Sequence, residues 1–160
     1  MNNSLKPLKT TYCYLRFLLA VFKDTRTTSK LDYESIMIIA TVATNYALAQ
    51  FKKNKSLEID KFWKIHKDDI KSGKNIIKEH NLTILKISKL LLIPKETTRR
   101  KVVNLCKKKI LIYSTKNRLK LGQNFQKFAK PMEKNDMKNL HKLLKCLNKV
   151  GTIKPLIKLK

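Results

Sequence analysis

The chain has 160 residues, enough for one domain or for one domain with appendages, and its 42% hydrophobic content is sufficient for a folded core. Three glycines and four prolines exclude most phosphate-binding loops and complex β topologies, so the composition predicts a mainly α protein. The formal net charge of +26 predicts a polyanionic partner, above all nucleic acid. Only five of the 37 basic residues are arginines, so AT-rich codon usage is an alternative source of much of the lysine excess.

The N-terminal segment combines a polar start with an apolar run. We expect residues 1–10 to be frayed and residues 24–30 to form a loop. Between them, Tyr12 to Lys23 is predicted to form a short helix. Its expected inward residues are Leu15, Leu18, Leu19 and Phe22. Arg16 interrupts the apolar run, so we expect no signal peptide.

A long helix is predicted from Asp32, its N-cap, to about Phe51, with Glu34 in the first turn, where the helix dipole favours an anion. The uncharged stretch from Ser35 to Phe51 has 17 residues, which is at the short end for a membrane span, so we expect a buried helix and no membrane partner. A strip of small residues suits either close core packing or a dimer interface. The strip is Ala40, Ala43 and Ala47.

Residues 52–72 carry mixed charge and predict a helix with Phe62, Ile65 and Ile70 inward. Trp63 is expected to anchor packing, with base stacking as the alternative. A further helix over 74–80, ended by His80, would supply the first helix of a three-helix core.

Residues 82–121 predict helix, tight turn, helix and hairpin. Thr83 caps a first helix, Ile84 to Leu91, whose inward residues would be Ile84, Ile87, Leu90 and Leu91. A turn at Leu92 and Ile93 follows, because Pro94 stops one helix and can open the next. The second helix, Lys95 to Lys108, would turn Thr98, Val102 and Leu105 inward. After it, the alternation from Ile110 to Tyr113, the turn at 115–117 and the return over 118–121 predict a β-hairpin.

The outer side of the second helix carries side chains that can hydrogen-bond base edges. Arginine pairs with guanine, asparagine with adenine, and a carboxylate can accept from cytosine. We expect base contacts from Glu96, Thr97, Arg100 and Asn104. We expect phosphate contacts from Arg99, Lys101, Lys107, Lys116 and Arg118. The alternative for Glu96 and Arg100 is an i, i+4 ion pair on a solvated helix.

This stretch resembles the winged helix-turn-helix domain of bacterial transcription regulators. The segment from Pro94 to Arg100, PKETTRR, is similar to the start of the recognition helix in Crp/Fnr-type regulators, close to R-E-T-x-x-R, with Lys95 in place of the first arginine. The resemblance implies DNA contacts for Lys95, Glu96, Thr97 and Arg100. Leu92 and Lys109 stand where that family usually has glycine.

The C-terminal part is expected to contain a connector over 122–131, with Phe125 and Phe128 packed on the domain. Asn135 or Asp136 would cap a last helix ending near Gly151, followed by a basic tail over 151–160. Its apolar strip should dock on the same chain or on a second copy. The strip is Met137, Leu140, Leu144 and Leu147.

The three cysteines, Cys13, Cys106 and Cys146, are far apart and give neither a disulfide framework nor zinc spacing. We therefore predict three free thiols in the cytoplasm, with no metal, cofactor or small-molecule ligand. No catalytic constellation is recognisable, so we do not expect an enzyme.

Together these patterns predict a mainly α fold: a winged helix-turn-helix with a three-helix core and a β-hairpin wing, an N-terminal helical hairpin and a C-terminal helix. The predicted domains are an N-terminal helical region at 1–72, a winged helix at 73–130 and a C-terminal helix and tail at 131–160. The predicted function is a sequence-specific, double-stranded DNA-binding transcription regulator. It would act as a homodimer through the 32–51 and 136–150 helices. The alternatives are a winged-helix module that binds protein or RNA, and a peripheral membrane protein.

Overall fold

The computed structural model describes residues 6–54, 56–72, 82–114 and 118–158. Its elements are mainly helical, with one two-stranded antiparallel sheet. The chain divides into two compact units. We call Leu31–Phe128 the central unit, and Met1–Lys30 with Ala129–Lys160 the terminal unit. This partition differs from the predicted boundaries after residues 72 and 130.

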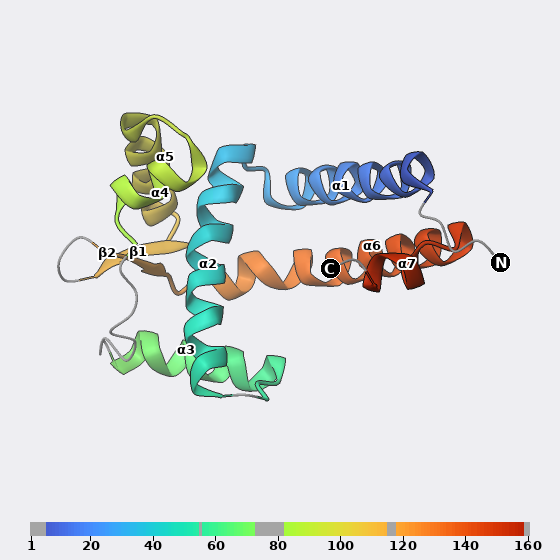
Figure 1. Cartoon of the computed structure of the whole chain (residues 1–160). Helices are drawn as coiled ribbons and strands as arrows, with labels where there is room; N and C mark the ends of the chain where they lie inside the picture. The colour runs from blue at the N-terminus through green and yellow to red at the C-terminus, as the bar shows by residue number, and fades with distance from the viewer. Residues whose placement is uncertain (1–5, 55, 73–81, 115–117, 159–160) are drawn as a thin grey trace. The chain divides into compact units, whose positions relative to one another are not determined.

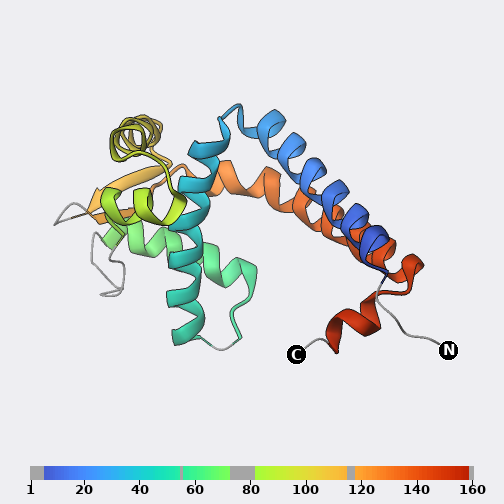
Figure 2. The same cartoon turned by 45° about the horizontal axis from the view of Figure 1, so that its top comes forward.

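The central unit is built around α2 (Tyr33–Lys53), which packs against α4 (Ile84–Leu91), α5 (Lys95–Lys107) and β2 (Arg118–Leu121) (Figures 1 and 2). Its core consists of apolar side chains from these elements and from β1 (Leu111–Ser114). The fully buried ones are Ile38, Val42, Ile87, Val102, Leu105, Leu111 and Leu119. Helix α2 therefore shares one core with α4 and α5. The helix predicted over 74–80 lies outside the described residues.

The start of α2 is confirmed: the backbone N–H of Ser35 donates to Asp32 Oδ1 at 3.0 Å, and Glu34 lies in the first turn. The small-residue strip is not the core face, because Ala40 is exposed and Ala43 and Ala47 are half-buried. The buried side of the helix instead carries Ile38, Ile39, Val42, Tyr46 and Ala49. Among the described helices, none is long and apolar enough to cross a membrane.

The two helices α4 and α5 and their tight turn are confirmed. Thr83 caps α4 by accepting from the N–H of Lys86 at 3.3 Å. Leu92 adopts φ 55° at the end of α4, and the Ser88 side chain donates to the Ile93 carbonyl at 2.7 Å, which closes the turn. The inward face was predicted wrongly at Leu90, which is 66% exposed, because α4 buries Ile87 and Ser88 and Leu90 is rotated about 200° from Ser88.

The β-hairpin is also confirmed, with Leu111 opposite Leu121 and Tyr113 opposite Leu119. Lys109 takes φ 56° before it, so both positions where a glycine is usual adopt the left-handed conformation with other residues. A Cβ at Gly122 would overlap the Lys109 carbonyl oxygen, so that position needs a glycine. The Leu119 N–H donates to the Leu82 carbonyl at 2.9 Å, so the chain entering α4 lies along β2. The turn over 115–117 lies outside the described residues.

Helix α3 (Ile59–Ser72) buries Trp63 and His66, whereas the predicted inward residues Phe62, Ile65 and Ile70 are only half-buried. Its expected face was therefore wrong by about one residue of rotation. Trp63 is a packing anchor, as predicted, with its ring 5.7 Å from that of Phe125.

The terminal unit contains α1 (Pro7–Ser29), most of α6 (Phe125–Val150), and α7 (Ile153–Ile157). Three expectations for it were wrong. Residues 7–10 and 24–29 are helical, because Pro7 opens α1 at its first turn and Lys30 closes it at φ 54°. The expected connector and the cap at Asn135 or Asp136 are replaced by one helix that continues through Pro131, where flanking helix formers offset the lost hydrogen bond. The tail contains α7, although the end of α6 at Gly151 is confirmed.

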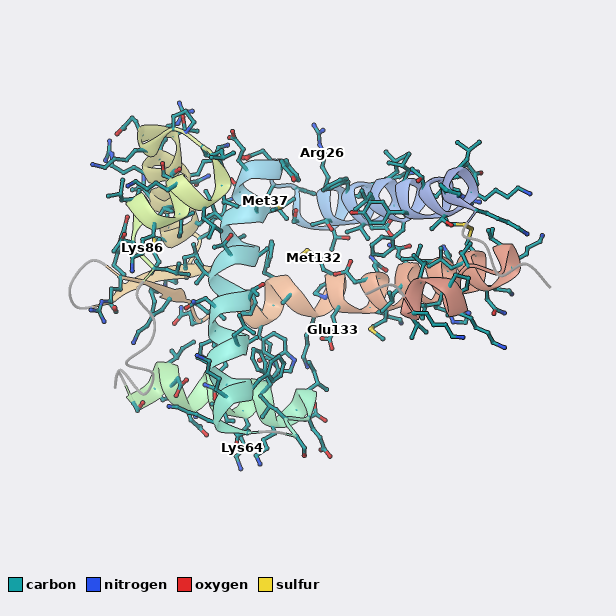
Figure 3. The ribbon with its side chains drawn as sticks, in the orientation of Figure 1. Arg26, Met37, Lys64, Lys86, Met132 and Glu133 are labelled. Carbon is teal, nitrogen blue, oxygen red and sulfur yellow. A yellow bond between two sulfur atoms is a disulfide. The ribbon has the colours of Figure 1, made fainter. Side chains whose placement is uncertain are left out.

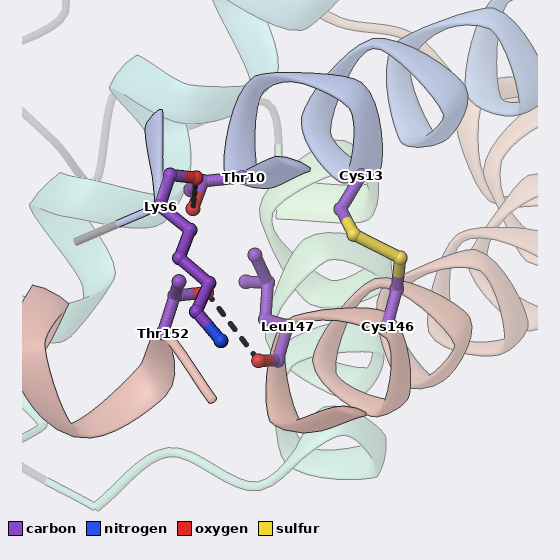
Figure 4. Close-up of a disulfide and its surroundings, with 6 residues drawn as sticks. All are labelled: Lys6, Thr10, Cys13, Cys146, Leu147 and Thr152. Atoms are coloured by element: carbon purple, nitrogen blue, oxygen red, sulfur yellow. Dashed lines mark hydrogen bonds between the residues drawn. A yellow bond between two sulfur atoms is a disulfide. The ribbon is translucent and has the colours of Figure 1, made fainter. Parts of the chain in front are cut away.

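Helix α1 pairs with α6 in this unit, and Asn139 Nδ2 of α6 donates to Asp24 Oδ2 of α1 at 2.9 Å. A disulfide joins Cys13 to Cys146 (Figure 4), so the prediction of three free thiols was wrong and only Cys106 is free. The expected buried stripes are largely exposed. They include Leu15, Leu19, Phe22, Met137, Leu140 and Leu144.

Candidate nucleic-acid interface

The orientation of α5 is set by three side chains that are 0% exposed: Thr98, Val102 and Leu105. The Thr98 hydroxyl donates to the Pro94 carbonyl at 3.1 Å, which satisfies its polar group inside the core. This inward stripe was predicted and is confirmed. Since successive residues of a helix are about 100° apart, the opposite side of α5 must face away from the core.

Three of the predicted base-contacting residues, Glu96, Arg100 and Asn104, are exposed on that opposite side, and Thr97 is half-buried at its edge. They come from three successive turns of one helix, so their polar groups form one row that presents a carboxylate, a guanidinium and a carboxamide group. Lys95 is also exposed, but in the first turn on the same side as Val102.

Glu96 is paired with Arg99 rather than with Arg100. Arg99 Nη2 lies 2.6 Å from Glu96 Oε1, and Arg99 Nε lies 2.9 Å from Glu96 Oε2, so the pair is bidentate. The hydrogen bond from Arg99 is the main cause that lowers the pKa of Glu96. The i, i+4 pair between Glu96 and Arg100 was therefore the wrong alternative, and the Arg100 guanidinium is not held by Glu96.

Unlike the other cations that we expected to bind phosphates, Lys101 is held by carboxylates of the protein itself. Its Nζ lies 2.6 Å from Asp32 Oδ1 and 3.0 Å from Glu34 Oε2, and its side chain is only 16% exposed. Partial burial raises the pKa of Asp32, but hydrogen bonds from Lys101 and Ser35 outweigh it and lower that pKa to about 2. Lys101 thus fastens α5 to the start of α2 and neutralises carboxylates beside the exposed row.

The remaining expected phosphate contacts are distributed around this surface. Arg99 and Lys107 are exposed on α5, and Arg118 is half-buried at the start of β2, opposite Ser114. Lys116 lies outside the described residues. Elsewhere on the central unit, Figure 3 shows Lys64 of α3 and Lys86 of α4, both exposed.

Two hollows border the exposed row. The first, of about 500 Å³, lies between α5 and the start of α2, and its lining includes Arg100, Asn104, Lys107, Asp32 and Ser35. The second, of about 370 Å³, is lined by Arg99 and Val103 of α5, Tyr113 of β1 and the start of α4. Sequence reasoning had treated Asp32 only as a cap. No local sequence pattern predicts that Asp32 lies beside α5, because Asp32 and Lys101 are 69 residues apart in the sequence.

Among the residues that the structure describes, no group of three or more His, Cys, Asp or Glu side chains could hold a metal ion. What the surface offers chemically is hydrogen-bond donors and positive charge on a rigid helix, next to a hairpin.

No family model, curated protein or solved structure matches this chain. The class that the fold itself defines is a mainly helical protein in which a pair of short helices, joined by a tight turn, precedes a two-stranded hairpin.

Proposed function

We propose that the central unit is a winged helix-turn-helix module and that the protein is a sequence-specific, double-stranded DNA-binding transcription regulator. The observation that carries this proposal is the polarity of α5: a stripe buried at Thr98, Val102 and Leu105, and an exposed row that includes Arg100 and Asn104. In proteins of this class, the second helix of the pair enters the major groove.

The surrounding architecture supports the same function. The hairpin follows α5 directly, as a wing would, and the chain before α4 contributes a backbone hydrogen bond to β2. Helix α2 supplies the third helix of the core by packing on both α4 and α5. A rigid core behind α5 matters because base readout requires side chains held in a fixed register.

The geometry divides the roles among the exposed side chains. Arg100 and Asn104 would bind base edges, since their planar groups can make bidentate pairs with guanine and adenine. Glu96 would orient Arg99 toward a flanking phosphate. Lys107 and Arg118 would bind phosphates and fix the register. We assign Lys101 to the fastening of α5 on α2, not to DNA, because two carboxylates already surround it.

The test is a selection of bound fragments from random duplexes at about 150 mM salt, because low salt inflates non-specific affinity. We expect Arg100→Ala to lose roughly ten- to hundredfold in affinity for the selected site, corresponding to about 1–3 kcal/mol, with little loss on random DNA. Lys107→Ala should weaken both by the same factor. Lys64→Ala, which removes an exposed cation from α3, is the matched control and should leave both affinities unchanged.

Equal losses by Arg100→Ala on selected and random DNA would contradict the assignment and favour the alternative of a protein- or RNA-binding module. The same selection reports the oligomeric state. A homodimer would select a two-fold-symmetric sequence with half-sites about one helical turn apart.

A further inference from the structure

The Cys13–Cys146 disulfide lies beside a hollow in the terminal unit. It connects α1 to α6 across 133 residues of sequence, with the two Cα atoms 5.9 Å apart (Figure 4). The adjoining hollow, of about 200 Å³, is lined by both cysteines and by Arg16, Phe17, Asn139 and Lys142. The disulfide is therefore next to space that a small reagent can enter, and two cations border that space.

Helix α1 buries little of its apolar surface. Among its described residues, only Cys13 and Thr25 are buried, and Phe17, Leu18 and Val21 are half-buried. Most of its large apolar side chains are exposed. They are Leu8, Tyr12, Leu15, Leu19 and Phe22. Since little apolar area is removed from water, the disulfide and the hydrogen bond between Asn139 and Asp24 are important links between α1 and α6.

We propose that this hollow is a site of thiol–disulfide exchange for a small thiol that carries carboxylate groups. The attacking species in such an exchange is the thiolate anion. Arg16 and Lys142 would attract both the thiolate and a carboxylate, and cations also stabilise the thiolate that leaves. The volume admits the thiol-bearing arm of such a molecule, with the rest of it in solvent.

The burial of the two cysteine residues favours one direction of attack. Cys13 is 2% exposed, whereas Cys146 is half-buried, so the incoming thiolate attacks Cys146 Sγ. A new S–S bond forms between the reagent and Cys146, the bond between Cys13 and Cys146 breaks, and its electron pair leaves on Cys13 as a thiolate. A second reagent thiolate then attacks the mixed disulfide. The products are the reagent disulfide, which is oxidised, and two cysteine thiols, which are reduced and take up two protons.

The consequence is that the pairing of α1 with α6 becomes dependent on the thiol pool. While the disulfide is intact, the two helices are linked near one end. Once it opens, the covalent link is lost and the pairing rests on non-covalent contacts alone, so α1 separates from α6 more readily.

The test uses the full chain with Cys106→Ser, so that Cys13 and Cys146 are the only cysteines. The native protein is exposed to thioglycolate, 2-mercaptoethanol or 2-mercaptoethylamine, which are negative, neutral and positive apart from the thiol. Opening is followed by alkylation and intact-mass measurement, with rates compared per concentration of thiolate. We expect thioglycolate to react about tenfold faster than the neutral thiol, and the positive thiol to react slowest.

Arg16→Ala and Lys142→Ala should each remove most of the preference for thioglycolate. Lys138→Ala, an exposed cation on α6 that does not line the hollow, is the control and should retain the preference. Peptide mapping should locate the transient adduct on Cys146. Equal rates for the three reagents, or a disulfide that opens only after denaturation, would overturn the proposal and assign the bond a purely structural role.

Discussion

The two units of the molecule differ in the interactions that stabilise each of them internally. The central unit buries apolar side chains from α2, α4, α5 and both strands in a shared core. The terminal unit leaves most of the large apolar side chains of α1 exposed and joins its helices by a disulfide and a polar contact. A core distributes stability over many contacts, whereas a covalent link concentrates it in one bond that chemistry can open. The first arrangement suits a rigid binding surface, and the second suits a part that changes with conditions.

The largest expected effect compares two leucine truncations. Leu105→Ala removes a fully buried side chain of α5, so we expect it to lower the free energy of unfolding by about 2–5 kcal/mol. Leu19→Ala removes a side chain of α1 that is 69% exposed, and a surface substitution of this kind usually changes stability by less than about 0.5 kcal/mol. Urea unfolding followed by circular dichroism measures both. Similar losses for the two variants would show that α1 has a core of its own and would remove the distinction between the units.

Much of the central unit could be predicted because its signals are local. Thr83 and Pro94 mark helix boundaries, the spacing of Thr98, Val102 and Leu105 gives the buried face of α5, and the change to a two-residue period gives the hairpin. Each signal depends on residues within one or two turns of each other. The outer side of α5 follows from the same periodicity, so the exposure of Arg100 and Asn104 was also predictable.

The contacts that were missed join distant parts of the chain. Cys13 and Cys146 are 133 residues apart, and Lys101 and Asp32 are 69 apart. A cysteine count gives no pairing at such a separation, and an acidic N-cap gives no sign of which helix lies beside it. In the terminal unit the apolar strips predict faces that dock on this chain or, for α6, on a second copy, and within the chain they are largely exposed. The helices instead face each other through Cys13, Asn139 and Asp24, which lie on other sides.

A second prediction compares His66 of the central unit with His141 of the terminal unit. His66 of the central unit is 2% exposed, and the rings of Tyr46, Trp63 and Phe125 lie 5.7–6.1 Å from it. Burial lowers the pKa of His66, opposed by the charge of Asp69 and by the Leu121 backbone. The unfolded chain therefore takes up a proton first as pH falls below about 6.5, so the stability of the central unit should decrease in that range.

Urea midpoints at pH 7.5 and 5.5 measure this dependence, which we expect to be smaller than the loss from Leu105→Ala. His66→Phe keeps an aromatic ring in the cluster and should reduce the dependence. His141→Phe changes an exposed histidine of α6 in the terminal unit and should retain it. If both variants kept the full dependence, protonation of His66 would not be its cause.

The smallest expected effect on stability comes from ionised carboxylates, of which we compare one in each unit. The pKa of Asp32 is lowered to about 2 by Lys101 and Ser35, although partial burial raises it, so its ionised form stabilises the central unit. This contribution is present above the unfolded pKa of 3.8 and is lost as pH falls toward 2. Because Asp32 and Lys101 are partly in water, we expect Asp32→Asn to cost only about 1 kcal/mol at pH 7. Asparagine is also a good N-cap, so this variant removes the charge while keeping the cap.

Asp136 in the terminal unit should behave in the opposite way. Desolvation, and then the negative charge of Asp24, raise the pKa of Asp136, so its ionised form opposes folding at neutral pH. Asp136→Asn should therefore slow hydrogen exchange in α1 and α6 at pH 7, whereas Asp32→Asn should speed it in the first turns of α2. Lowering the pH from 7 toward the unfolded pKa of 3.8 should also slow exchange in the terminal unit, once the intrinsic pH dependence is subtracted. If both substitutions changed the hydrogen-exchange rate in the same direction, the two carboxylates would affect the stability of their units alike. The proposed electrostatic difference between the units would then be wrong, even if the difference between their cores remained.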